Sequence, residues 1–219
     1  MKITDLKSQV WTQYTTKIRP GDIGAVVDTG IVARLSSRMI LPSTDFLHFF
    51  LFAEYVPGEN DFVILESIPS HGVAVARASW YLDKTVAVFR PSREHVLLAG
   101  VLPNKATGTH LSPEQLGREA VWQATKWGRS RYDYRICVEI GYRAITGCLR
   151  NWIQGKGFTV HFTEFPLSRD KSLLCTQLVD EAYYELYPVF DRCYEVLPAN
   201  FMSQYADGYL DYICGWPEK

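Results

Sequence analysis

Residues 45–67 read DFLHFFLFAEYVPGENDFVILES, and this stretch decides the fold. It holds two apolar runs, residues 45–56 and 61–67, on either side of Pro57-Gly58-Glu59-Asn60. Proline fixes its own φ and glycine tolerates a positive φ, so the residues between the runs predict a turn that joins two strands. Residues 46–52 are apolar except for His48, which predicts a strand buried on both faces.

The surrounding segments predict further strands and helices. Their spacing predicts strands over residues 22–28, 72–76, 85–89 and 158–162, and helices over 4–17, 31–39, 112–128, 134–153, 172–187 and 199–213. The helix after residue 112 has the clearest start, because Ser112, Pro113 and Gln115 supply an N-cap, a first-turn proline and a capping-box glutamine. The helix over 134–153 is expected from the spacing of Cys137, Ile140, Ala144, Cys148 and Trp152.

The composition indicates a globular protein of one large domain. The chain has 219 residues, a formal net charge of −1, 47% hydrophobic and 14% aromatic residues, which argues against disorder and against a nucleic-acid partner. We find neither a secretory signal nor a membrane-spanning run, so a cytoplasmic location is expected. The five cysteines show no zinc-site spacing, which favours free thiols and predicts no metal or cofactor.

Cys175 is the candidate nucleophile. It lies in SRDKSLLCTQLVDEAYYELYP, residues 168–188, where Asp170 or Ser172 can cap a helix and apolar residues recur every four positions. The thiol is expected in the first turn, pointing inward, where free N–H groups and the helix dipole stabilise both a thiolate and an oxyanion. Most buried cysteines are ordinary core residues, and this segment alone favours that interpretation.

His48 is the candidate base. It lies in a strand whose other side chains are almost all apolar, so its imidazole must find a polar partner. A hydrogen-bonded core histidine is the simpler interpretation of this position alone. His161 is the main rival as base, whereas the remaining histidines fall in expected loops or just before a helix, at His71, His95 and His110.

Glu66 is the candidate third member, because a carboxylate can fix the tautomer of an imidazole and stabilise its charged form. Glu54 shares a strand and a parity with His48 but lies about 20 Å away at ~3.4 Å per residue. Glu66 reaches His48 only if the two strands pair with Phe50 opposite Glu66. A two-residue turn at Pro57-Gly58 would shift the pairing by one and place Glu66 on the other face.

The order of these segments resembles the permuted papain-like hydrolases of the NlpC/P60 superfamily, particularly the YiiX/YebB-like group. The family pattern is roughly pGDi, SHvgi, viEa with a following GV, vaVlRp, YDy and yCSeLv. The matching segments, between residues 19 and about 187, are RPGDI (19–23), LH (47–48), VILES with GV (63–67, 72–73), VAVFRP (86–91), YDY (132–134) and LCTQLV (174–179). Leu47 and Thr176 replace the family serines, and about forty residues separate Tyr134 from Cys175.

The resemblance implies a circularly permuted papain-like α+β fold, an antiparallel sheet packed against helices, over residues 1–219 as a single domain. It also implies a helical insertion around residues 135–170. By the same resemblance, Cys175 is the nucleophile, His48 the base and Glu66 the polar third member of a cysteine-dependent hydrolase. An amide or ester bond in a peptide, cell-wall peptide or lipid is the expected substrate. A thiol acyltransferase on lipids and an inactive peptide- or lipid-binding module are the alternatives.

Overall fold

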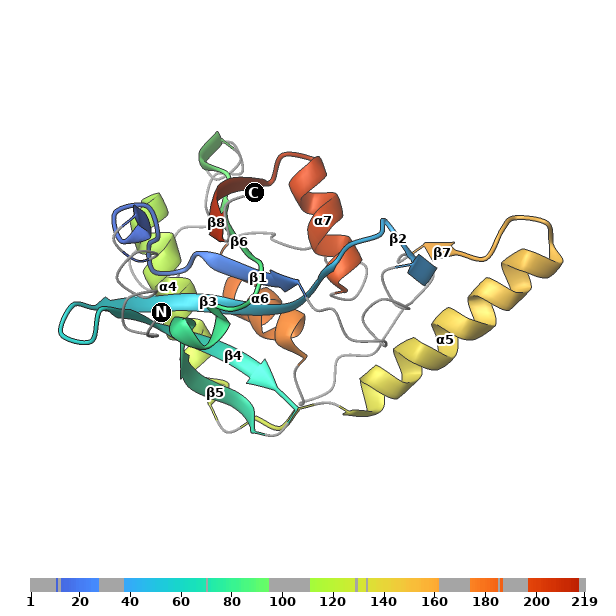
Figure 1. Cartoon of the computed structure of the whole chain (residues 1–219), viewed down its shortest axis with the longest axis horizontal. Helices are drawn as coiled ribbons and strands as arrows, with labels where there is room; N and C mark the ends of the chain where they lie inside the picture. Colours follow the sequence, from blue (N-terminus) through green and yellow to red (C-terminus); the bar gives the residue numbers. More distant parts are fainter. Residues whose placement is uncertain are drawn as a thin grey trace.

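The protein has an α+β fold in which one antiparallel sheet packs against helices (Figure 1). The computed structural model describes residues 11, 13–27, 38–69, 71–94, 111–128, 130–132, 134–161, 174–184, 186 and 197–216. The strands, in their order across the sheet, are β5 (Gly72–Arg77), β4 (Asp61–Ile68), β3 (Phe46–Val56), β1 (Ile23–Val27), β6 (Val86–Pro91) and β8 (Leu210–Trp216). The α+β expectation and the strands expected over residues 22–28, 45–56, 61–67, 72–76 and 85–89 are confirmed.

The central strand β3 is buried on both faces, as the sequence predicts. Residues 49–52 of β3 are fully inaccessible to solvent. Phe49 and Leu51 belong to one core, and Phe50 and Phe52 belong to the other, since successive side chains point to opposite faces of a sheet. The position of β3 inside the sheet, between β1 and β4, therefore gives the protein two cores.

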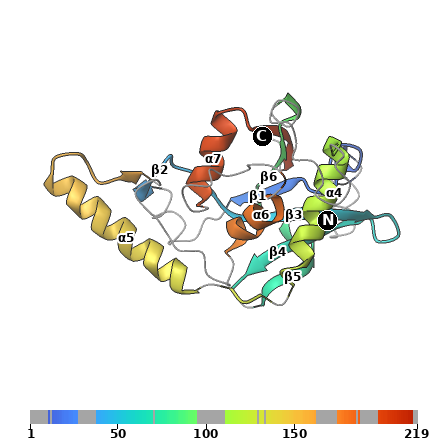
Figure 2. The ribbon, with the colours of Figure 1, turned by 180° about the vertical axis from the view of Figure 1, so that it is seen from behind.

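Helices fill the first core. α4 (Pro113–Thr125) and α6 (Cys175–Tyr183) pack on each other and on β3, as the view from behind shows (Figure 2). α4 begins with the predicted capping box, in which the Ser112 hydroxyl accepts from the Gln115 N–H and the Gln115 side chain accepts from the Ser112 N–H. On the opposite face, the second core is closed by aromatic residues before β1 and by Trp216 of β8.

The structure corrects the expected ends of the late elements. The expected helix over 199–213 is shorter, α7 (Pro198–Ala206), and is followed by the unpredicted strand β8 (Leu210–Trp216). The strand expected over 158–162 is reduced to β7 (Val160–His161), which pairs in parallel with β2 (Ile40–Leu41). The helices expected over 4–17 and 31–39 fall largely outside the described residues.

The helix over 134–153 has the predicted bounds, as α5 (Tyr134–Ile153). Ala144 and Cys148 are buried against β2 and β7, and Ile140 packs beside them. Cys137 and Trp152, which share the apolar spacing of this helix, are exposed. α5 extends away from the main sheet, within the segment where the helical insertion is expected (Figure 1).

Candidate active site

Cys175 is the first residue of α6. The predicted caps Asp170 and Ser172 lie outside the described residues, and the N-cap is Leu174, whose N–H donates to Oε1 of Gln177 at 2.8 Å. The first bond within the helix runs from the Leu178 N–H to the Leu174 carbonyl. The N–H groups of residues 175–177 therefore precede the first helical hydrogen bond, and they are the groups that favour negative charge at a helix start.

The thiol of Cys175 lies against the strand that carries the histidine. Its Sγ is 3.7 Å from the carbonyl oxygen of Leu47, and its side chain is close enough to His48 to raise the pKa of the imidazole. Cys175 is 8% exposed, so the thiol is inward, as expected, without being sealed from solvent. Helix α6 and strand β3 thus bring together two residues that are 127 positions apart in the sequence.

A bulge in β3 places His48 at this position. Val26 of β1 pairs with His48 and Val27 pairs with Phe46, so Leu47 is an extra residue without a partner in β1. A bulge of this kind bends a strand and changes the direction in which neighbouring side chains point. The His48 side chain is 21% exposed, which leaves it reachable from solvent beside the Cys175 thiol.

A second bulge in β3 brings Glu66 to the same face. Near the turn, Val56 pairs with Asp61 and Glu54 pairs with Val63. If this pairing continued without interruption, Glu66 would lie opposite Leu51, on the face away from His48. Ala53 is an extra residue in β3, so Glu66 pairs with Phe50 instead. The pairing that the His48–Glu66 contact requires is therefore confirmed.

Glu66 holds the imidazole through Nε2. Its Oε2 lies 2.7 Å from Nε2 of His48, and the Glu66 side chain is 1% exposed. A buried carboxylate in this place assigns the Nε2 proton to the neutral ring and leaves Nδ1 for the thiol. Oε1 of Glu66 has no hydrogen-bond partner among the described residues. The three predicted residues thus form one connected group, in the order thiol, imidazole and carboxylate.

Tyr81 completes this group and was not predicted. It ends the short 3-10 helix η1 (Ala78–Tyr81), and its hydroxyl donates to Oε2 of Glu66 and lies 3.0 Å from Nε2 of His48. Its ring stacks on His48, with centroids 5.6 Å apart and planes 26° apart, and its carbonyl accepts from the Trp216 indole. No spacing distinguishes it among thirteen tyrosines, so sequence reasoning had no signal for it.

The electrostatics of the group favour a charged imidazole. Burial lowers the pKa of His48, but hydrogen bonds to Cys175 and Glu66, together with the charges of these two groups, outweigh burial and raise it to about 10. Burial, the hydrogen bond to Glu66 and the nearby negative charges raise the pKa of Tyr81, so its hydroxyl keeps the proton that it donates. At neutral pH a proton on His48 is therefore held between the thiol group and the carboxylate.

The rival histidines lie elsewhere or outside the described residues. His161 is exposed in the small sheet beside α5, and His71 is exposed before β5. His95 and His110 fall outside the described residues. Of the described histidines, His48 is the one that contacts Cys175.

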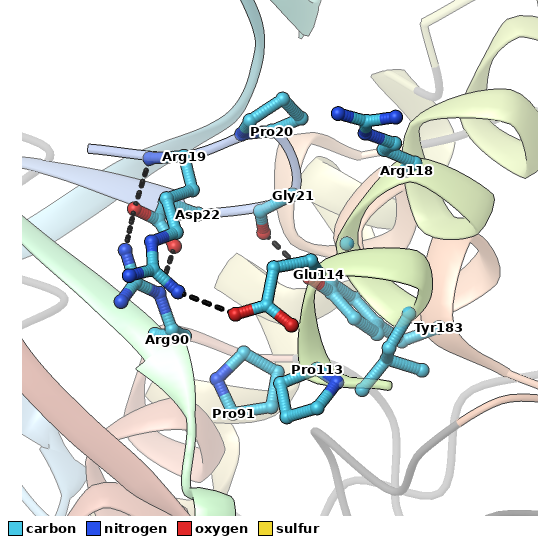
Figure 3. A pocket seen from close by; sticks show the side chains of 12 residues that line it. Arg19, Pro20, Gly21, Asp22, Arg90, Pro91, Pro113, Glu114, Arg118 and Tyr183 are labelled. Carbon is cyan, nitrogen blue, oxygen red and sulfur yellow. Dashed lines mark hydrogen bonds and ion pairs between the residues drawn. The ribbon is translucent and has the colours of Figure 1, made fainter. Parts of the chain in front are cut away.

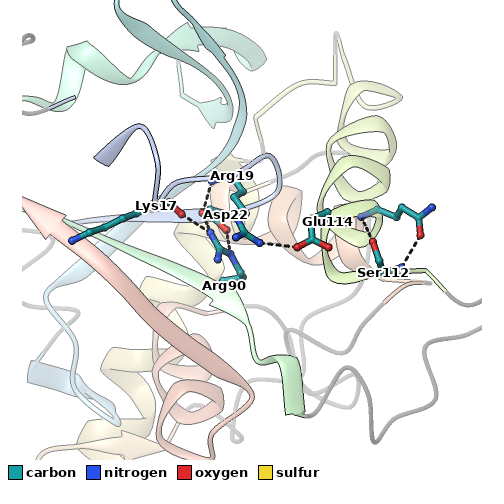
Figure 4. A network of polar contacts seen from close by, with 7 residues as sticks. Lys17, Arg19, Asp22, Arg90, Ser112 and Glu114 are labelled. Carbon is teal, nitrogen blue, oxygen red and sulfur yellow. Dashed lines mark hydrogen bonds and ion pairs between the residues drawn. The ribbon is translucent and has the colours of Figure 1, made fainter. Parts of the chain in front are cut away.

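A second polar cluster lies at the other end of β1. Arg90 of β6 donates from Nε to Oδ1 of Asp22 and from a terminal nitrogen to Oδ2, both at 2.7 Å, and the Arg19 N–H donates to the same carboxylate (Figure 4). Asp22 is 1% exposed. The cluster joins the RPGDI segment to the VAVFRP segment, so the ionic residues of these two motifs support each other.

Gly21 in this region fixes the two helices relative to the sheet. It has φ +89°, and a Cβ there would lie 2.3 Å from the Cα of Gly117 in α4. The hydroxyl of Tyr183 in α6 donates to the Gly21 carbonyl beside a pocket lined by Arg19, Pro91 and Arg118 (Figure 3). The glycine therefore lets α4 approach β1 closely, and its carbonyl holds α6, the helix that carries Cys175, through the hydrogen bond from Tyr183.

Neither a family model nor a curated protein matches this chain. Over the described residues, each helix is too short or too polar to cross a membrane. The same residues hold no group of three or more His, Cys, Asp or Glu side chains arranged to bind a metal ion. The geometry of the site is therefore the basis for a function.

Proposed function

We propose that this protein is a cysteine-dependent hydrolase of an amide or ester bond, with Cys175 as nucleophile, His48 as base and acid, and Glu66 as the group that orients His48. One observation carries the proposal: a thiol at the first residue of a helix lies beside an imidazole whose Nε2 is held by a buried carboxylate. This arrangement of nucleophile, base and orienting group is the signature of an activated nucleophile.

The first half of the reaction forms an acyl-enzyme. The Cys175 proton passes to Nδ1 of His48 before the substrate reacts, which gives the charged imidazole that the site favours. The thiolate then attacks the carbonyl carbon of the substrate to form a C–S bond. The oxygen that becomes negative accepts hydrogen bonds from the N–H groups at the start of α6, beginning with that of Cys175. When the tetrahedral intermediate collapses, the C–N or C–O bond breaks and His48 gives its proton to the leaving group.

The second half releases the acid. His48, now neutral, takes a proton from a water molecule, and the resulting hydroxide attacks the thioester carbonyl. The C–S bond breaks, and the proton on His48 returns to the Cys175 sulfur. Glu66 remains a carboxylate throughout and stabilises the imidazolium that forms in each half, as the acid of a catalytic triad does.

The order of segments supports the same proposal. The histidine strand and the glutamate strand precede the cysteine helix in the chain, as they do in the permuted papain-like hydrolases that the sequence resembles. The Asp22–Arg90 pair and Gly21 give the other motif residues a structural reason to be present, because they secure the sheet and the helix that carries the thiol. A permuted papain-like fold is therefore part of the proposal.

The first test measures how the reactivity of the Cys175 thiol depends on pH. Iodoacetamide alkylation, followed by peptide mass spectrometry, compares Cys175 with Cys137, an exposed cysteine outside the site in the same chain. An ordinary thiol, with a pKa of ~8.5, loses about tenfold in rate for each pH unit below that value. We expect Cys175 to stay reactive at pH 6 and to exceed Cys137 there, although it is the more buried of the two.

Matched variants assign this reactivity to the site. His48→Gln should remove the excess reactivity of Cys175 at pH 6, whereas His161→Gln, at an exposed histidine outside the site, should leave it unchanged. Hydrolysis of a p-nitrophenyl ester by wild type, and its loss in Cys175→Ala, measures the complete reaction. The proposal is wrong if Cys175 reacts no faster than Cys137 at pH 6 or if ester hydrolysis survives in Cys175→Ala.

A further inference from the structure

Helix α5 has two apolar stripes. The inner stripe holds Ile140, Ala144 and Cys148, which pack with β2, β7 and the start of α7. The outer stripe lies on a different face of the helix, and its residues are exposed to 72%, 68%, 52%, 43% and 63%: Val138, Tyr142, Ile145, Leu149 and Trp152. A helix that needs only to cover its own protein requires one such stripe, so the outer stripe calls for a separate explanation.

The spacing of the outer stripe specifies what covers it. Its members are separated by four, three, four and three residues, an average period of 3.5. This is the repeat that keeps apolar residues facing a second helix over several turns, whereas the inner stripe, with steps of four, suits packing on strands. The outer stripe therefore fits another α-helix.

The position of α5 makes the stripe accessible along the helix. Both views of the protein show α5 extending outward from the main sheet, with its C-terminal end far from the body (Figures 1 and 2). The ion pair of Arg143 and Glu139 lies outside the stripe, on a third face of α5. A second helix can therefore cover the stripe without burying this pair.

We propose that the outer stripe of α5 binds the α5 helix of a second copy of this chain, in an antiparallel pair with two-fold symmetry. In that pair, Tyr142 meets Trp152 of the second copy. Ile145 then meets Leu149 of the second copy, and symmetry repeats both contacts. Aromatic residues face aromatic ones at the ends and aliphatic residues face aliphatic ones at the centre, so the stripe is complementary to itself.

The area of the stripe is sufficient for a dimer. Aromatic side chains bury about 150–250 Å² each and aliphatic ones somewhat less, so the four that meet in the pair, roughly half to two-thirds exposed, remove about 500 Å² per copy. Two copies then bury about 1,000 Å², which reaches the lower limit for a specific interface and exceeds most crystal-packing contacts. The bodies of the two molecules can add to this area beyond the helices.

The test measures the oligomeric state of the full-length protein by sedimentation velocity over a wide concentration range. Wild type should form a dimer whose fraction rises with concentration. The double variant Ile145→Glu/Leu149→Glu should sediment as a monomer at all concentrations. Val75→Glu/Trp122→Glu, which makes the same change at exposed apolar residues of β5 and α4, should remain a dimer.

Far-UV circular dichroism and thermal unfolding check that each variant is folded. Should the double variant unfold, Ile145→Lys, a single change at the centre of the proposed pair, provides the same test with less disturbance. A wild-type protein that stays monomeric at the highest concentration overturns the proposal. A dimer that persists in the α5 variants also overturns it. So does a wild-type monomer that binds phosphatidylcholine vesicles through the outer stripe.

Discussion

Replacing Glu66 by glutamine removes one negative charge from the candidate site while keeping the shape of the side chain. In the wild type, Oε2 of Glu66 accepts from the hydroxyl of Tyr81 and lies 2.7 Å from Nε2 of His48. The carboxylate is 1% exposed, so water cannot replace it. The amide can still accept a hydrogen bond from Tyr81, but it no longer attracts a proton to His48. The pKa of His48 is therefore expected to fall.

The size of this fall follows from the strength of the lost interaction. A hydrogen bond to a charged group contributes about 1.5–3 kcal/mol, and 1.36 kcal/mol corresponds to one pH unit. The pKa of His48, about 10 in the wild type, should therefore drop to about 8 or 9 in Glu66→Gln, because Cys175 still supports the charged form. A pKa below 6.5 is not expected while the thiol remains.

NMR titration of the imidazole Cε1–H of His48 measures this pKa directly. The matched control is Glu59→Gln, which removes an exposed carboxylate from its surface pair with Arg77. Exposed pairs of this kind contribute little, so the control should leave the His48 titration unchanged. A His48 pKa that is equal in wild type and Glu66→Gln, or that falls equally in Glu59→Gln, would refute the assignment of Glu66 as orienting group.

Three other outcomes follow from the contacts of the site. Tyr81→Phe removes a hydrogen bond to the buried Glu66 and should lower the free energy of unfolding, measured in urea, by about 2 kcal/mol. An unchanged free energy of unfolding would show that this hydrogen bond does not stabilise the protein. Because the folded pKa of His48 is raised to about 10, its contribution to stability is complete below pH ~6.5 and lost as the pH rises towards 10. The difference in unfolding free energy between wild type and His48→Gln should shrink over that range, and a growing difference would reverse the assigned sign. Gly21→Ala should lower the free energy of unfolding by about 2 kcal/mol or more, because φ is +89° and the backbone of α4 occupies the position of a Cβ. Gly58→Ala, with open space around it, should change thermal stability little. Equal losses of stability in the two variants would contradict this reasoning.

The sequence predicts the parts of the site that depend on local patterns. Apolar runs and a turn identify the strands that carry His48 and Glu66, and helical spacing places Cys175 in a first turn. These features need no knowledge of the rest of the chain. The order of the motifs then indicates which three residues meet.

The contacts that complete the site depend on features without a local signal. The bulges at Leu47 and Ala53 arise where a strand adjusts to two neighbours at once, so the sequence of β3 alone does not locate them. Tyr81 reaches Glu66 from a segment with no periodicity. Trp152 belongs to the apolar spacing that predicts α5, but helical spacing does not show which of two apolar faces meets the protein.

Because of the bulge at Ala53, deleting a residue from β3 and inserting one there have different effects on the position of Glu66. If Ala53 is deleted, Phe52 still pairs with Ile64 and Glu54 still pairs with Val63, so the ladder becomes regular and Glu66 stays opposite Phe50. If a residue is added between Phe50 and the turn, a single bulge no longer suffices, and Glu66 changes face. Over evolutionary time, this strand can therefore shorten by one residue without dismantling the site, but it cannot lengthen by one unless a second bulge forms.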